Sequence, residues 1–204
     1  MSASCATPND PPALSHYVPF LTRGAAASLE KHTMNNITKL VCIAALGCTG
    51  MAISLSAQAA VTDQDKQFLT NVSQGGMDEI KLSELAETKA TNPEVKAFAH
   101  KMVVEHKALA MRMQPFADAW GIAAPAGLDP DHQAEYDKLS GLSGAEFDKE
   151  YMNAMVKDHH GALDLFNEEV KTTTDMRFKT TVMHGQSVVA AHTHMADSLD
   201  AKLS

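Results

Sequence analysis

Apolar residues recur every three or four positions along four long segments of this 204-residue chain. That spacing is typical of an α-helix that buries one face. The segments cover about residues 63–90, 93–120, 143–172 and 174–203. No stretch alternates apolar and polar residues as a half-buried strand would, so the pattern predicts an all-α protein.

Polar residues at the segment ends predict where the helices start. Asp63 and Thr174 are the expected N-caps of the first and last helices, and Pro93 suits the first turn of the second. Ser143, with Glu146 three residues later, predicts a capping box at the start of the third.

Two of the three connections between these helices are short. The third, residues 121–143, is rich in Ala, Pro and Gly and is long enough to cross the protein, with a short helix expected near residues 131–139. We therefore expect an antiparallel four-helix bundle with a longer connection between its second and third helices.

One ionisable residue interrupts each apolar stripe. The four are Glu79, His106, His159 and His192. An isolated buried charge costs several kcal/mol unless it is paired or binds a metal, so the four are expected to meet. Depths counted from the first turn agree for Glu79 and His106 to about one helical turn, whereas depths counted from the last turn offset His192 from His159 by about 9 Å. Three imidazoles and a carboxylate predict one site for zinc, copper or iron.

Other residues near this site have two interpretations each. Glu105 and Asp158 directly precede two of the histidines and are expected to orient a histidine on a neighbouring helix or to form ion pairs between helices. Met102 and Met155 lie one turn before the same histidines and are either soft-metal ligands or core residues. His132 is expected at the periphery.

The N-terminal part of the chain differs from the rest in composition. Residues 1–33 show no helical or strand period and are interpreted as an upstream over-extension of the reading frame or a disordered arm. Residues 34–59 contain a positive charge, then an apolar run, then small residues suited to cleavage. This order is typical of a secretory signal peptide, and Met34 is its expected start. Lipidation at Cys48 is the alternative. The mature domain is then residues 60–204, which contain no cysteine, so a metal site there would not use thiolate.

Composition and motifs exclude some functions. A formal net charge of -8 argues against a nucleic-acid partner. No Gly-rich phosphate loop, nucleophile elbow or Cys-His pairing is present in the sequence, so nothing in it indicates an enzyme. No transmembrane span is expected in residues 60–204, and an envelope partner or a homo-oligomer stays open.

Several motifs resemble one family of secreted bacterial proteins. They are Met102-Val103-x-Glu105-His106, Phe147-Asp148-x-x-Tyr151, Met155-Val156-x-Asp158-His159, and the final His192. The resemblance covers roughly residues 63–203 and is to a ferritin-like domain of unknown function, often labelled as an outer-membrane protein. It implies a ferritin-like bundle and an exported location, in the periplasm or at the outer membrane, and it supplies no activity. No histidine follows a Glu by three residues, so a di-iron ferroxidase centre is not expected.

The sequence therefore predicts an envelope protein with one metal site in its core, acting in metal binding or envelope stress. The alternative is a non-enzymatic envelope protein in which the Glu and His residues form a structural polar network and the surface binds a partner.

Overall fold

The computed structural model describes residues 60–204, and within them it contains five α-helices and no strand. The helices are α1 (Asp63–Lys89), α2 (Pro93–Trp120), α3 (Pro130–Gly141), α4 (Gly144–Thr172) and α5 (Met176–Leu203). The prediction of an all-α protein is confirmed. The predicted signal peptide and the segment before it lie outside the described residues.

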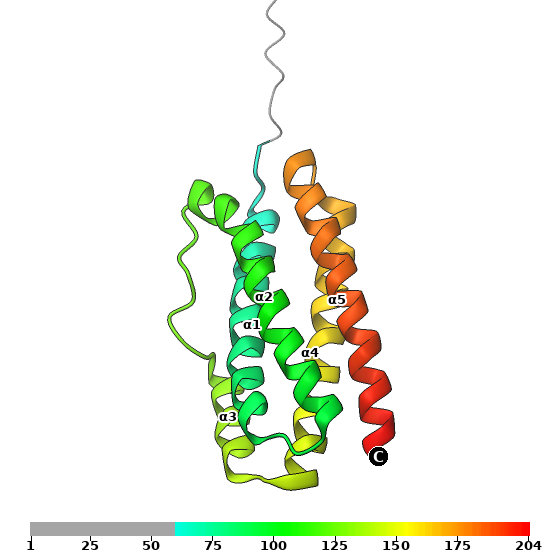
Figure 1. The fold of residues 1–204 in the computed structure, drawn as a ribbon. Coiled ribbons are helices and arrows are strands. Elements are labelled where there is room, and N and C mark those ends of the chain that lie inside the picture. The colour runs from blue at the N-terminus through cyan, green and yellow to red at the C-terminus, as the bar shows by residue number, and fades with distance from the viewer. Residues whose placement is uncertain (1–59) are drawn as a thin grey trace, which may run out of the picture. The chain divides into compact units, whose positions relative to one another are not determined.

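The four long helices pack side by side (Figure 1). α1 packs against α2 and α4, and α5 packs against α4 and α2. Residues 90–92 and 173–175 are the short connections, so α1 and α2 run antiparallel, as do α4 and α5. The short helix α3 packs on α1 and α4 within the longer connection. Among residues 60–204, we find no helix with enough apolar length to span a membrane.

Two helix starts differ by one residue from the sequence-based expectation. Thr62, not Asp63, caps α1, because Thr62 and Asp65 exchange hydrogen bonds between their side chains and backbone N–H groups. Asp175, not Thr174, caps α5, because its carboxylate accepts hydrogen bonds from the first free backbone N–H groups of the helix.

The capping box predicted at the start of α4 is not formed. Ser143 occupies the N-cap position, but its side chain makes no capping hydrogen bond. Gly144 follows with a φ of 61°, in the left-handed region.

Two apolar clusters form the core, and polar residues lie between them in sequence on every long helix. One cluster includes Leu82, Phe98, Met155 and Ala196, and the other includes Phe68, Met113, Phe166 and Val182. Glu79, His106, His159 and His192 each fall between a residue of one cluster and a residue of the other along their own helix. The four therefore form a polar layer across the buried core.

The Phe-Asp-x-x-Tyr motif is part of the scaffold. The Asp148 carboxylate accepts hydrogen bonds from the Thr91 backbone N–H (3.0 Å), the Thr91 hydroxyl (2.6 Å) and the Asn92 backbone N–H (2.8 Å). Tyr151 is fully buried and hydrogen-bonds the Ser83 hydroxyl at 2.8 Å. The start of α4 is thus joined both to α1 and to the α1–α2 connection.

Gly185 allows α5 to approach α4 closely. A Cβ added at Gly185 would lie 2.4 Å from Cε1 of the buried Phe166 ring. We expect Gly185→Ala to lower the free energy of unfolding by about 2 kcal/mol, because the ring has to move in a packed core. Urea denaturation measures this cost. Gly161→Ala on α4 is the control, since its Cβ meets nothing within 4 Å. Equal stability of the two variants would contradict the expectation.

Glu169 gives the stability of the fold a pH dependence. Burial, with a contribution from neighbouring Asp65, raises the pKa of Glu169 to about 7. Ionisation of the folded protein is therefore unfavourable, and stability is lost as the pH rises from about 4.5 through 7.

Glu169→Gln should remove this loss of stability. We expect the variant to be more stable than the wild type by about 2 kcal/mol at pH 8 and similar to it at pH 5. Thermal denaturation at both pH values tests this, with the exposed neighbour substitution Glu168→Gln as the control. A difference that does not change with pH would contradict the assignment.

Candidate metal centre

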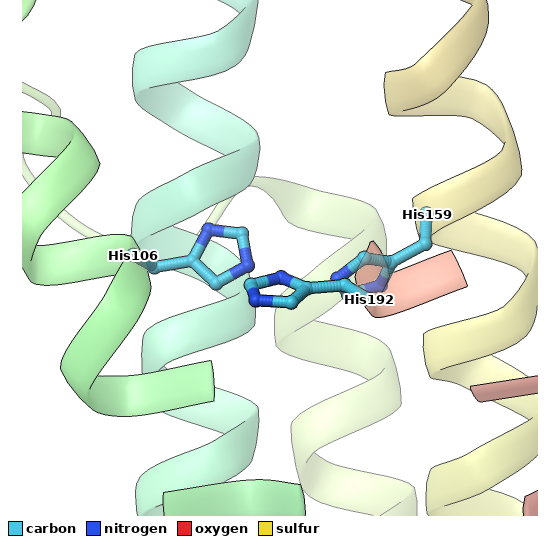
Figure 2. A group of neighbouring side chains, drawn as sticks. All are labelled: His106, His159 and His192. Atoms are coloured by element: carbon cyan, nitrogen blue, oxygen red, sulfur yellow. The ribbon is translucent and has the colours of Figure 1, made fainter. Parts of the chain in front are cut away.

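Three histidine side chains from different helices converge in the polar layer. Figure 2 shows His106 of α2, His159 of α4 and His192 of α5 facing one another. One ring nitrogen from each lies within 4.8 Å of the corresponding nitrogen of the other two. All three residues are buried, with exposed fractions of 6%, 0% and 0%. His192 is thus part of the histidine group, although the depth counted from the last turn in the sequence had offset it from His159.

The turn at residues 173–175 explains why His192 reaches the group. These residues belong to neither helix, and α5 starts only at Met176. Counted from the helix ends, His159 and His192 therefore differ in depth by about one turn, which helix tilt and side-chain length can accommodate.

Hydrogen bonds fix the tautomers of two of these histidines. His159 Nδ1 lies 2.9 Å from the Met155 carbonyl oxygen, and His192 Nε2 lies 2.6 Å from Glu105 Oε2. Both oxygens are acceptors, so those nitrogens donate. The other nitrogens, His159 Nε2 and His192 Nδ1, then carry free lone pairs. Donation to a carbonyl or carboxylate is the usual arrangement of a metal-ligating histidine.

Each of the three histidines keeps one ring nitrogen without a hydrogen bond among residues 60–204. His159 Nε2, His192 Nδ1 and His106 Nε2 are all buried and lack a hydrogen bond among the described residues. An unpaired polar atom in a core costs about 1–3 kcal/mol. A bound metal ion would satisfy all three at once, so this donor set fits a transition metal.

Glu79 lies beside two of the histidines. Its carboxylate oxygens are 3.3 Å from His106 Nε2 and 3.3 Å from His159 Nδ1. Burial raises the pKa of Glu79, against the effect of His106. Glu79 does not belong to the group whose ligand atoms all lie within 4.8 Å, so it borders the three imidazoles and could supply a fourth, oxygen ligand.

Burial also determines the charge state of the histidines. It lowers the pKa of His106 to about 4, although Glu79 opposes this. It lowers the pKa of His192 to about 4 despite the hydrogen bond to Glu105, and it lowers that of His159. All three imidazoles are therefore neutral at pH 7, which is the form that binds metals.

Glu105, Met102 and Met155, which lie near the histidines in sequence, make different contacts in the structure. Glu105 on α2 contacts His192 on α5 and also pairs with Lys101. Desolvation raises the pKa of Glu105, but the hydrogen bonds from Lys101 and His192 outweigh it and the pKa is lowered. Met102 and Met155 are fully buried members of an apolar cluster.

A second group of titratable side chains was missed by the sequence analysis. His132, expected at the periphery, lies among three carboxylates: Asp129 at 2.9 Å, Asp78 at 3.3 Å and Asp158 at 3.5 Å. The hydrogen bond to Asp158, then that to Asp129, raises the pKa of His132 to about 9 against its partial burial. Its cation joins α3 to α1 and α4, and three ligand atoms of this group also lie within 4.8 Å.

The only sequence signal for this second group was local. Asp129 caps α3 and accepts a hydrogen bond from the His132 backbone N–H, as an Asp before a Pro and three residues before a polar residue often does. Nothing local indicated that Asp78 and Asp158 of other helices would face the same imidazole.

Comparison with known proteins gives a family and a fold. The family described as "Domain of unknown function (DUF4142)" matches residues 50–199. Three solved structures each match 69% of the chain. The first is a DUF305 fragment from Deinococcus radiodurans, with 15% identity, a TM-score of 0.59 and 97% of that chain covered. The second is a DUF305 protein from Streptomyces coelicolor described as secreted, with 17% identity, a TM-score of 0.58 and 92% of that chain covered. The third is CopM in the Cu(II)-bound form, with 19% identity, a TM-score of 0.59 and 97% of that chain covered. At these identities the similarity shows the fold alone. A comparison with curated proteins finds no match.

Proposed function

Since the chain belongs to the DUF4142 family of domains of unknown function, we propose its function from its site: it is an exported protein that binds one transition-metal ion in the core of its helices. His106, His159 and His192 are the proposed nitrogen ligands, and Glu79 is the proposed oxygen ligand. Zinc, copper and iron are the candidate ions, because all three accept imidazole and carboxylate.

One observation carries this proposal. Three buried imidazoles from three helices each have a ring nitrogen without a hydrogen-bond partner among the described residues, and the group is compact enough for one ion. A purely structural polar network would be expected to satisfy its own donors and acceptors. The similar CopM structure is described as the Cu(II)-bound form, which supports testing copper first.

Export is the second part of the proposal. It rests on the signal-peptide composition of residues 34–59, which makes residues 60–204 the mature domain. The similar Streptomyces coelicolor protein is described as secreted, which agrees with this. The ferritin-like classification and the outer-membrane label stay predictions, as does a role in envelope stress.

Metal analysis of the protein tests the site. The protein is purified without an affinity tag and its metal content is measured by mass spectrometry. The metal-free protein is then titrated with Cu(II), Zn(II) and Fe(II) in turn. We expect about one ion per chain. No metal on purification and no uptake from any of the three would contradict the proposal and favour the structural network.

A further inference from the structure

A cavity of about 530 Å³ lies beside the polar layer, among α1, α2 and α4. Its walls are mainly apolar and include Met77, Leu109, Met113 and Phe166. Glu79 and His106 supply a polar edge. This volume and this mixture of apolar walls with a few polar groups are typical of small-molecule sites.

Three glycines in helix interiors line the cavity. Gly75 and Gly76 lie in the middle of α1, and Gly161 lies within α4. Glycine in a helix interior is destabilising relative to alanine. None of the three has a positive φ, so the backbone conformation does not require glycine.

Packing does not require these glycines either. A Cβ at Gly75 or Gly161 would meet nothing within 4 Å, and a Cβ at Gly76 would meet only His106 Nδ1, at an ordinary 3.7 Å. Larger side chains would therefore fit in the helices but would take up space in the cavity. The glycines have the effect of keeping the cavity open.

The α2–α3 connection closes one side of the cavity and is held in place. Ala124 and Pro125 of this connection line the cavity. Beside them, the Gln74 side chain of α1 donates a hydrogen bond to the Gly127 carbonyl at 3.0 Å. His132, which also lines the cavity, is fixed by its three carboxylates. The wall is thus a built part of the fold.

From these features we infer that the cavity is a binding site for one small, uncharged and largely apolar molecule that carries a hydroxyl group. The apolar walls would surround its hydrocarbon part, with the unbranched Met77 and Met113 adapting to its shape. The hydroxyl would hydrogen-bond at the Glu79–His106 edge. The inference is made for the metal-free protein, because Glu79 and His106 are also proposed metal ligands.

Binding of a matched pair of probes tests the inference. The metal-free protein is titrated with 2-naphthol and with naphthalene, and binding is followed by fluorescence. We expect one saturable site per chain and binding of 2-naphthol at least tenfold tighter than that of naphthalene. Absence of saturable binding overturns the inference, and equal affinity for the two probes overturns the role of the hydroxyl.

Filling the cavity is the second arm of the test. Gly75→Leu and Gly161→Leu should each weaken 2-naphthol binding at least tenfold while the melting temperature stays the same or rises, because leucine favours the helix. Gly141→Leu, an equivalent change at the exposed end of α3, should leave binding unchanged. Undiminished binding in both filled variants overturns the location.

Metal uptake by the same variants separates this site from the metal centre. Gly75 and Gly161 are not proposed ligands, so the filled variants should take up metal like the wild type. Loss of 2-naphthol binding with retained metal uptake is the expected result. Parallel loss of both would show that the substitutions disturb the whole core and would overturn an independent cavity site.

Discussion

His159→Ala should bind the metal roughly 100-fold more weakly than the wild type, or more weakly still. His159 is fully buried, its Nδ1 lies 2.9 Å from the Met155 carbonyl oxygen, and its Nε2 is buried without a hydrogen bond among the described residues. Changes to residues that merely orient a ligand typically cost 10–100-fold in metal affinity, so loss of a ligand should cost at least the upper value. Competition with a chelator of known affinity measures the change.

His160→Ala is the matched control for this experiment. His160 is the next residue of α4, but its side chain is exposed and pairs with Asp197 on the surface. We expect its metal affinity to equal that of the wild type. Circular dichroism of both variants shows whether the helices are retained. If folded His159→Ala binds metal as tightly as His160→Ala, the three histidines are not the site.

Asp148→Ala should have the largest effect on stability, a loss of about 3 kcal/mol. The buried carboxylate accepts three hydrogen bonds from the α1–α2 connection, and its removal leaves two backbone N–H groups without that partner. Hydrogen bonds to a charged group contribute about 1.5–3 kcal/mol each, and relaxation of the connection recovers part of the sum. Urea denaturation measures the free energy of unfolding.

The control is Asp164→Ala, an exposed position on the same helix, which should change stability by less than about 0.5 kcal/mol. Metal affinity should be unchanged in both variants, because Asp148 lies about three turns before His159 on α4 and its hydrogen bonds among the described residues go to the α1–α2 connection. A cost below about 1 kcal/mol for Asp148→Ala would show that the motif does not hold the connection.

The helices were predictable because their signals are local. The apolar stripes and Pro93 at the start of the second helix predict the long helices to within a few residues. The errors at Asp63 and Thr174 come from short-range competition, since the adjacent Thr62 or Asp175 side chain accepts the hydrogen bonds of the first helix N–H groups instead. One ionisable residue per stripe was also readable, because each interrupts an otherwise apolar face.

The second histidine group and the cavity were not predictable in this way. His132 lies on a short helix with a weak apolar pattern, and its burial depends on where the long connection settles against α1 and α4. A glycine in the sequence likewise does not show whether open space or a close helix contact lies beside it. Gly75 and Gly185 both occupy stripe positions, yet a Cβ at the first meets open space and a Cβ at the second would overlap Phe166.

The hydrogen bond between Glu105 and His192 connects the buried polar layer to the protein surface. His192 has no exposed area, whereas 35% of the Glu105 side chain is exposed, as is 40% of its partner Lys101. Substitutions at exposed helix positions are usually neutral. Here a substitution of Glu105 would remove the acceptor that fixes which nitrogen of a core imidazole carries the proton. A substitution on the outside of α2 can therefore affect the protonation of a buried imidazole without altering any residue of the core.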